Sequence, residues 1–325
     1  MKRLFTTLVA AASIAGAATM TTAAKAEYPD RPITVIVPWG AGGGTDATGR
    51  MLAKLMQDEL GVPVNVVNRT GGSGVVGHQA IASAKPDGYT VGIVTVEIAM
   101  MHWAGLTELS HKDFTPIALY NADPAGVSVA IDSPYNSVKE VLDAVKAAPA
   151  GTMKGSGTGQ GGIWHLALAG MLVDAGIDPA SVPWVPSQGA APALADLAAK
   201  GIDIVTASVV EARALKEAGK IKVLAVMADE RLAAFPDVPT MQESGGPGWK
   251  TAAWRTVAGP KGLPEDVKAK LVATIEKAYK SQEFQDFMAS RGFGVVWDGP
   301  EGLAKFYEAA DADFGKVMKA VGLAK

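Results

Sequence analysis

The chain has 325 residues, with 30 Lys and Arg against 33 Asp and Glu, a formal net charge of −3 and no cysteine. This mildly acidic balance, with charges spread along the chain, excludes the basic surface of a DNA- or RNA-binding protein, and the lack of cysteine excludes disulfide bonds as a source of stability. A chain of this length can bury a core that is stable on its own, and its size suits two α/β domains.

The first 26 residues predict a secretory signal. Lys2 and Arg3 form a basic start, residues 4–20 are apolar, and residues 24–26 (Ala-Lys-Ala) form a small-x-small cleavage site. The apolar stretch is shorter than the roughly 20 residues of a membrane-spanning helix. We therefore expect export to the periplasm, with cleavage after Ala26. Removal of the three positive charges in this segment would change the net charge from −3 to −6.

Strand-like apolar runs alternate with amphipathic helical stretches along the rest of the chain. In chain order, the predicted strands are Ile33–Val37, Val64–Val67, Val91–Val94, Val127–Ile131, Ile202–Thr206 and Ile221–Met227. The predicted helices are Ala47–Leu60, Val138–Ala148, Trp164–Ala175, Ala191–Lys200, Pro264–Lys280 and Glu301–Val321. This alternation predicts parallel-rich sheets covered by helices.

Two polar stretches, Tyr120–Pro124 and Ser244–Lys250, are the predicted crossings between domains. If the chain crosses at both, residues 27–122 and 251–325 form a discontinuous domain I, and residues 123–250 form domain II. A chain that crosses twice produces a hinge and a cleft between two lobes, which is a common place for a small-molecule site.

Each predicted lobe carries a glycine-rich turn before a helix. In the first lobe, residues 40–44 (Gly-Ala-Gly-Gly-Gly) precede Thr45 and Asp46, and in the second lobe residues 155–162 contain five glycines. Such turns aim backbone N–H groups and the positive end of a helix dipole at one point, which suits an anion. The alternative is that the glycines only allow tight turns and close packing of helices.

Signatures of other chemistry are weak. Both turns match a dinucleotide-binding pattern, but Asn68 and Arg69 stand where the acidic ribose-binding residue is expected. The loop at residues 72–78 resembles a phosphate-binding loop in which His78 replaces the lysine. The histidines lack metal-ligand spacing, and the chain contains no G-x-S-x-G nucleophile elbow. We therefore expect no catalytic residues, no metal and no cofactor.

Short motifs follow one another along the chain. They are Tyr28–Pro29–Asp30–Arg31–Pro32, Val37–Pro38–Trp39 with Gly42–Gly43–Gly44–Thr45–Asp46, Lys85–Pro86–Asp87–Gly88–Tyr89–Thr90, Gly155–Ser156–Gly157 with His165–Leu166–Ala167, Asp237–Val238–Pro239–Thr240, and Trp254 with Ala258–Gly259–Pro260. In this order and spacing, the chain resembles the extracytoplasmic solute receptors of tripartite tricarboxylate transporters, the Bug receptors. The resemblance implies a two-lobed, Venus-flytrap periplasmic binding protein of the α/β class, with a parallel-rich sheet in each lobe and a ligand cleft between the lobes.

The resemblance also implies what the protein does. A monomeric receptor would capture a small organic carboxylate and deliver it to the membrane subunits of the transporter. The alternatives are a secreted α/β enzyme acting on a small carboxylate, and a ligand sensor without transport. An enzyme needs a reactive group in the cleft, and the sequence offers no convincing one.

By position, the resemblance implies ligand contacts from both lobes. The implied contacts are Trp39, Ala41, Gly43, Thr45, Asp46 and Ser73 in the first lobe, and Ser156, Thr158, Gly159, His165, Gln188, Gly189 and Ala190 in the second. Thr95, Glu97 and Ser208 follow predicted strands where this chain departs from the family pattern, and we include them in the site. Glu97 lies either at the rim, paired with a surface base, or in the pocket, where it would match a cationic or hydrogen-bond-donating part of the ligand.

Two further questions stay open at this point. Asp46 either caps the helix or touches the ligand, and an anion beside an anionic ligand is unfavourable unless a donor intervenes. The tryptophans in or next to predicted cleft segments either pack in the core or line an aromatic wall. They are Trp39, Trp103, Trp164, Trp184 and Trp254.

Overall fold

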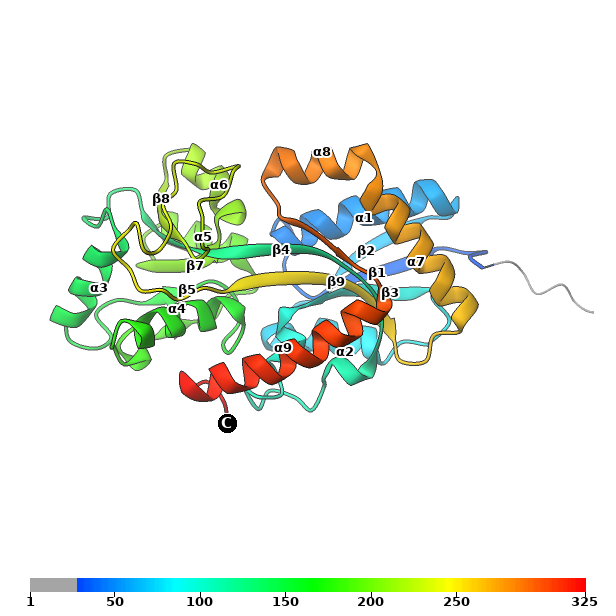
Figure 1. Cartoon of the computed structure of the whole chain (residues 1–325), viewed down its shortest axis with the longest axis horizontal. Coiled ribbons are helices and arrows are strands. Elements are labelled where there is room, and N and C mark those ends of the chain that lie inside the picture. The colour runs from blue at the N-terminus through cyan, green and yellow to red at the C-terminus, as the bar shows by residue number, and fades with distance from the viewer. Residues whose placement is uncertain (1–27) are drawn as a thin grey trace, which may run out of the picture.

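The computed structural model describes residues 28–325, so the predicted signal segment, residues 1–26, lies outside the described residues. The described chain forms two lobes joined by two long strands (Figure 1). Ten strands make one continuous sheet that passes through both lobes. No helix within residues 28–325 has the length and apolar character needed to cross a bilayer.

The first lobe is built on parallel strands. Strands β1 (Ile33–Val37), β2 (Val64–Asn68) and β3 (Thr90–Thr95) lie in the order β2-β1-β3, with β1 parallel to both neighbours. The run Ile-Thr-Val-Ile-Val of β1 is β-branched throughout and almost wholly buried, as expected for a parallel strand covered on both faces. Helices α1 (Gly44–Leu60), α2 (Val75–Ala82), α7 (Glu265–Lys280) and α8 (Gln282–Arg291) surround these strands.

The second lobe repeats this arrangement on a smaller scale. Strands β5 (Gly155–Ser156), β6 (Trp184–Val185) and β7 (Ile204–Ser208) are parallel, while β8 (Ile221–Val226) pairs with β4 in the antiparallel direction. The helices of this lobe are α3 (Val138–Ala147), α4 (Ile163–Asp174), α5 (Ala190–Ala198) and α6 (Val209–Glu217). Short 3₁₀ turns cover Gly72–Gly74, Val96–Ala99, His111–Asp113 and Pro179–Ser181.

Two antiparallel strands connect the lobes. Strand β4 (Phe114–Ala130) pairs with β9 (Ala252–Pro260) up to Pro124 and then, from Ala125 on, with strands of the second lobe. The predicted crossing at Tyr120–Pro124 therefore falls inside β4, and the one at Ser244–Lys250 lies just before β9. Strand β10 (Val295–Asp298) pairs with β4, and α9 (Pro300–Ala320) runs below the crossing strands and contacts β4 (Figure 1).

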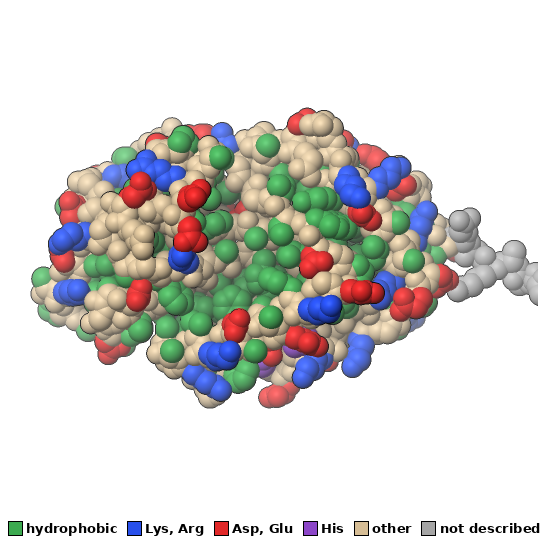
Figure 2. Space-filling view, in the orientation of Figure 1, with side chains coloured by type: hydrophobic (Ala, Val, Ile, Leu, Met, Phe, Trp, Pro, Cys, Tyr) green, Lys and Arg blue, Asp and Glu red, His purple; other side chains and the backbone are tan. Residues whose placement is uncertain are grey.

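On the face of the molecule drawn in Figure 1, apolar and charged side chains occupy different parts of the surface. Figure 2 shows apolar side chains gathered in the middle of the molecule, between the lobes, and charged side chains spread around the margins. The described residues form one continuous hydrophobic core that includes strands of both lobes. The two lobes are therefore packed together rather than held only by a linker.

Candidate functional site

A cavity lies between the two lobes, beside the crossing strand β9. In this closed structure the free space inside it is about 20 Å³, room for about one water molecule, so a larger ligand enters only when the lobes part. The first lobe supplies Trp39, Gly40, Gly43, Gly44, Thr45, Thr95, Val96 and Glu97, the second supplies Thr158, Ile163, Trp164, Gly189, Ala190 and Glu211, and β9 supplies Ala253, Trp254 and Arg255. The first turns of α1, α4 and α5 therefore line one cavity, and helix N-termini favour negative charge.

A buried arginine stands at one end of the cavity. Arg255 is only 2% exposed and lies on β9, in register with Thr95 of β3 on one side and Asn121 of β4 on the other. Its Nε donates to Thr45 Oγ1 (2.9 Å), and its Nη1 donates to Asp123 Oδ2 (2.5 Å) and to Asn121 Oδ1. Burial alone would lower the pKa of Arg255, but the nearby carboxylates raise it, so the guanidinium stays charged.

The carboxylate that faces Arg255 is itself held in place. Asp123 Oδ1 accepts hydrogen bonds from the backbone N–H of Gly294 (2.8 Å) and from Asn121 Nδ2 (3.1 Å). Asn121 Nδ2 also donates to the Gly294 carbonyl (2.7 Å). The position of Arg255 is therefore fixed by strands β4 and β9 and by the segment before β10.

The Nη2 nitrogen of Arg255 is the part of the guanidinium that is free to bind a ligand. Among the residues that the structure describes, it lies 3.7 Å from Glu211 Oε1, an ion pair without a hydrogen bond. Nη2 reaches the first turn of α1, where a Cβ atom on Gly44 would lie 2.6 Å from it. Only glycine at position 44 leaves room for the guanidinium.

Two glutamates, one from each lobe, each accept a hydrogen bond from the first turn of a helix in the opposite lobe. Glu211 of the second lobe accepts the Gly44 N–H at the start of α1 (Oε1, 3.0 Å), and its Oε2 accepts from Ser208 Oγ (3.0 Å). Glu97 of the first lobe accepts the Ile163 N–H at the start of α4 (Oε1, 3.3 Å). Each helix N-terminus thus binds a carboxylate from the other lobe, as expected from the helix dipole.

Behind Glu97, two side chains hold its carboxylate in position. Thr95 Oγ1 donates to Glu97 Oε2 (2.5 Å) and accepts from Trp39 Nε1 (3.2 Å). His78 Nε2 accepts from the Thr95 backbone N–H (3.0 Å), so the ring proton is on Nδ1, which donates to the Gly74 carbonyl (2.8 Å). Burial lowers the pKa of His78 to about 4, and the ring is neutral at neutral pH. Burial also raises the pKa of the Glu97 carboxyl, although its hydrogen-bond donors offset part of that effect.

One polar atom in the cavity wall has no partner. Thr158 Oγ1 is buried and makes no hydrogen bond within the described part of the chain, although the side chain lines the cavity. A Cβ atom built on Gly162 would lie 3.3 Å from this hydroxyl and 3.4 Å from Glu97 Oε1, so the two oxygens are at most 6.7 Å apart, with no hydrogen bond between them. A buried hydroxyl without a partner is unfavourable, and a ligand would supply one.

The lobes also touch at two further places. The Gly40 N–H donates to the Gln188 carbonyl (3.0 Å), and a Cβ atom on Gly159 would lie 2.4 Å from Ser73 Oγ. Together with the two glutamate contacts, these interactions keep the cleft closed in this structure.

The structure places half of the predicted site residues in the cavity wall. These residues are Trp39, Gly43, Thr45, Thr95, Glu97, Thr158, Gly189 and Ala190. Glu97 is only 3% exposed, so the rim interpretation of this residue is wrong. Of the five tryptophans, Trp39, Trp164 and Trp254 line the cavity, whereas Trp103 and Trp184 do not.

The other predicted residues lie next to the cavity or away from it. They are Ala41, Asp46, Ser73, Ser156, Gly159, His165, Gln188 and Ser208. Asp46 accepts the Gly42 N–H (3.0 Å) and bonds with Arg50 and Asn68; burial alone would raise its pKa, but these donors lower it. Asp46 therefore has a capping role within the first turn of α1, although Gly43 is the N-cap residue.

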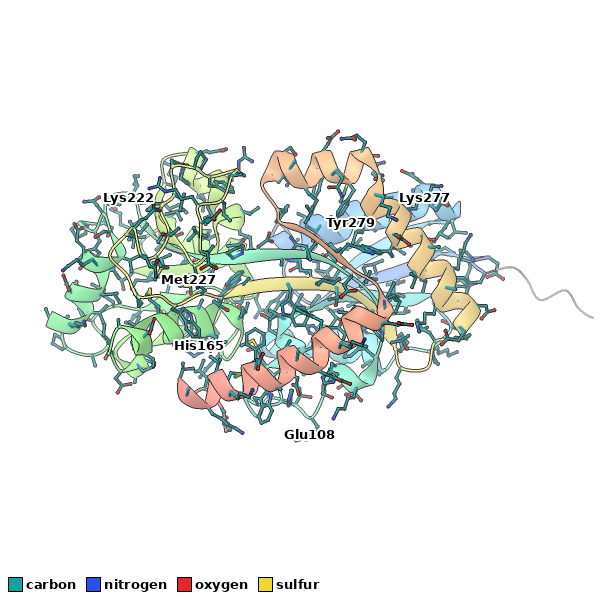
Figure 3. The ribbon with its side chains drawn as sticks, in the orientation of Figure 1. Glu108, His165, Lys222, Met227, Lys277 and Tyr279 are labelled. Carbon is teal, nitrogen blue, oxygen red and sulfur yellow. The ribbon has the colours of Figure 1, made fainter. Side chains whose placement is uncertain are left out.

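Serines and a histidine account for most of the remaining positions. Ser156 Oγ donates to the Val185 carbonyl (2.7 Å), and Ser208 caps α6 and positions Glu211. His165 of α4 (Figure 3) stacks on Trp184 with ring centroids 4.7 Å apart and lines a separate groove; burial lowers its pKa to about 4.

The charged residues that hold the site together are not among those predicted from the sequence. Arg255 has a recognisable signal, because it is the single charge in the otherwise uncharged stretch 251–260, and a charge inside a buried strand needs partners. Asn121 and Asp123 were assigned to a polar crossing rather than to a site. Glu211 carries no local signal, since only the closure of the lobes brings it to the start of α1.

Known proteins match this chain over most of its length. The sequence profile described as "Tripartite tricarboxylate transporter family receptor" matches residues 48–323. A protein encoded in the tcbD-tcbE intergenic region of Pseudomonas sp. is 30% identical over 294 residues, which cover 90% of this chain and 86% of that protein. Protein BugT of Bordetella pertussis is 30% identical over 283 residues, 84% of each chain.

Solved structures share the fold. The periplasmic binding protein BugD has a TM-score of 0.85 at 30% identity, over 92% of this chain and 100% of BugD. MatC from Rhodopseudomonas palustris, solved with bound malate, has a TM-score of 0.81 at 28% identity, over 89% of this chain and 99% of MatC. Another R. palustris protein, solved with adipate, has a TM-score of 0.85 at 28% identity, over 92% and 99% of the two chains. The predicted periplasmic-binding-protein fold is thereby confirmed.

Proposed function

This chain belongs to the tripartite tricarboxylate transporter receptor family, and we propose that it is a periplasmic receptor for a small organic carboxylate. The receptor would bind its ligand in the cavity between the lobes and deliver it to the membrane subunits of a tripartite transporter. The observation that carries this proposal is the meeting of Arg255 Nη2 with the first turns of α1 and α4 in one cavity.

A ligand carboxylate would bind at the Arg255 end of the cavity. Nη2 has free donors there, and a charge-assisted bond to a guanidinium is among the stronger hydrogen bonds. The Gly44 N–H lies beside it and is now bound to Glu211. A ligand oxygen would share or replace this contact when it enters. The malate- and adipate-bound relatives support a carboxylate as the ligand class.

The composition of the cavity wall supports binding rather than catalysis. The residues that line it in the described chain include no His, Cys, Lys or Ser. Threonine hydroxyls do line it, and the one beside a base, Thr95, already donates to Glu97 and accepts from Trp39 as part of the cavity wall. The nearest histidine, His78, lies 3.4 Å from that hydroxyl, but both of its ring nitrogens are hydrogen-bonded to backbone groups.

Binding of a carboxylate by the mature protein tests this function. We expect one or more of succinate, malate, adipate and citrate to raise the melting temperature, because a ligand at a hundredfold excess over its Kd stabilises the fold by about 2.7 kcal/mol. Proton NMR of the solution should show the ligand unchanged after hours of incubation. Chemical conversion would favour the enzyme alternative, and failure of every carboxylate to bind would contradict the proposal.

We also propose that export removes residues 1–26 and that residues 27–122 with 251–325, and residues 123–250, are the two domains that close on the ligand. N-terminal sequencing of the periplasmic protein should begin at Glu27. Solution scattering should show a smaller radius of gyration with ligand than without. An intact Met1 in the membrane fraction would contradict the first expectation, and identical scattering profiles would contradict the second.

A further inference from the structure

The charges of the cavity are not balanced, and this bears on which carboxylate the protein binds if the proposed function holds. Arg255 is the one positive group, whereas Glu97 and Glu211 line the cavity and Asp123 contacts Arg255. With all four groups ionised, one positive and three negative charges leave a net charge of −2. Arg255, Glu97 and Asp123 are at most 3% exposed, so solvent screens them little.

The positive charge of Arg255 is already matched inside the protein. Asp123 binds Nη1 at 2.5 Å, and Glu211 lies 3.7 Å from Nη2. One further carboxylate, from a ligand, fits at Nη2 because this nitrogen has free donors. A second ligand carboxylate would find no comparable cation among the described residues that line the cavity.

At the other end, Glu97 forms no ion pair with the residues that the structure describes: burial raises the pKa of its carboxyl, and Arg255 lowers it only through space. Within the described chain, its contacts are the Thr95 hydroxyl and the Ile163 N–H, and no Lys, Arg or His lies within ion-pair distance. A carboxylate offers about four acceptor sites, and these two donors leave acceptor capacity unused. The protein therefore keeps a buried carboxylate without an ion pair beside the cavity.

The hydroxyl next to Glu97 also lacks a partner. Thr158 Oγ1 comes from the other lobe, is buried, and lies at most 6.7 Å from Glu97 Oε1. Both side chains line the cavity. An N–H donor between them would be accepted by both oxygens, whereas a carboxylate would be able to accept only from the Thr158 hydroxyl and would face the negative charge of Glu97.

Tryptophan rings also favour a cationic group in the ligand. Trp39, Trp164 and Trp254 all line the cavity, and the face of an indole ring attracts cations. We infer that the ligand carries a single carboxylate, bound at Arg255, and an ammonium or amide N–H group at its other end, bound by Glu97 and Thr158. Glu97 would then select against simple dicarboxylates.

Two matched ligand series test this inference. Succinate, succinamate and 4-aminobutyrate, and likewise adipate, adipamate and 6-aminohexanoate, differ at one end in carrying a carboxylate, an amide or an ammonium. Isothermal titration of the mature protein should give an affinity at least about tenfold higher for the amide or the ammonium than for the dicarboxylate of the same series. The better of the two donors identifies the ligand's group.

Variants of Glu97 and Thr158 test whether these residues cause the ligand preference. Glu97→Gln should remove it and improve dicarboxylate binding, while Thr158→Val should weaken the donor-bearing ligands more than the dicarboxylates. Glu108→Gln is the matched control, because Glu108 is an exposed acid of the same lobe at the lower edge of the molecule (Figure 3), and the ranking should stay that of the wild type. Circular dichroism checks that each variant is folded.

Two results would overturn the inference. One is a wild-type protein that binds succinate, adipate or citrate at least as tightly as every donor-bearing ligand. The other is a folded Glu97→Gln variant with the wild-type ranking. Failure of all these carboxylates to bind would instead count against the proposed receptor function itself.

Discussion

The two ends of the cavity both hold a buried glutamate that binds the helix N-terminus of the opposite lobe, yet they differ in charge balance. At one end, Glu211 lies 3.7 Å from Arg255, which Asp123 also binds. At the other end, Glu97 has only a hydroxyl and a backbone N–H as partners. The same interaction with a helix is therefore part of an ion network at one end and involves a carboxylate without an ion pair at the other.

This difference separates stability from selectivity. A buried charge with partners holds strands and helices in place, and its removal leaves other charges unpaired. A buried charge without a cation contributes less to stability, but it restricts what can bind beside it. The Arg255 end thus anchors the closed cleft, and on our inference the Glu97 end selects the ligand.

Replacement of Arg255 should have the largest effect. Arg255→Met leaves Asp123 and Glu211 buried without a positive partner, so we expect a loss of about 3–5 kcal/mol in the free energy of unfolding measured with urea. Arg231→Met is the matched control, because Arg231 forms an exposed ion pair with Glu243, and its loss should change the unfolding free energy much less than Arg255→Met does. Equal losses in both variants would contradict a special role for the Arg255 network.

Acid should destabilise the Glu97 end through His78. The folded state holds the pKa of this ring at about 4, below its ordinary value of 6.5, so the unfolded chain takes up the proton first. Stability is therefore present above pH 6.5 and is lost as the pH falls toward 4, by about 3 kcal/mol for this residue.

Single variants in each lobe show how much each lobe contributes to the pH dependence of stability. His165 has a similarly lowered pKa in the second lobe, so it adds a loss in the same pH range. His78→Gln keeps an acceptor for the Thr95 N–H but does not titrate, and it should flatten the unfolding free energy between pH 4 and 6.5. His165→Gln serves as the comparison. A His78→Gln profile as steep as that of the wild type would contradict burial of a neutral His78.

A methyl group at position 44 should disturb the Arg255 end. In Gly44→Ala, the new Cβ would lie 2.6 Å from Arg255 Nη2 and 3.1 Å from Glu211 Oε1, so we expect a loss of about 1–3 kcal/mol despite the better helix propensity of alanine. Gly43→Ala is the matched control: its nearest neighbours would be 3.7 and 3.8 Å away, and the loss should stay within about 1 kcal/mol. Indistinguishable melting curves for the two variants would show that the guanidinium moves without cost.

The two glutamates should give the smallest effects, with opposite signs. Glu211→Gln weakens the bond to Gly44 and the ion pair with Arg255, so we expect a loss of about 1 kcal/mol at pH 7. Burial disfavours the charged form of Glu97, so Glu97→Gln should keep or raise the melting temperature. Scanning calorimetry at pH 7 compares them. A clear loss in Glu97→Gln would mean that its carboxylate is as well compensated as Glu211.

Sequence patterns predicted most helices and strands β1, β2, β3, β7 and β8 to within a few residues. The run Ile33–Val37 is a strand with the predicted bounds, and α1 starts three residues before its prediction, at Gly44. The patterns failed at the crossing strands. Strand β4 contains Pro116 and Pro124, residues that are rare inside strands, and irregular pairing accommodates the first of them. In the sequence, a strand with these prolines resembles a linker.

The sequence by itself determined the α/β alternation, the family and the glycine-rich turns, because these depend on local spacing of apolar residues and on residues without side chains. The tertiary structure decided the charge balance of the cleft. Asp123, Glu211 and Arg255 lie far apart in the chain and come together only when β4, α6 and β9 meet. Whether Glu97 faces solvent or ligand was likewise decided by the closure of the lobes, since its surroundings come from α4. The partners of a buried charged side chain depend on how distant segments of the chain pack together, and that packing is set by the whole fold.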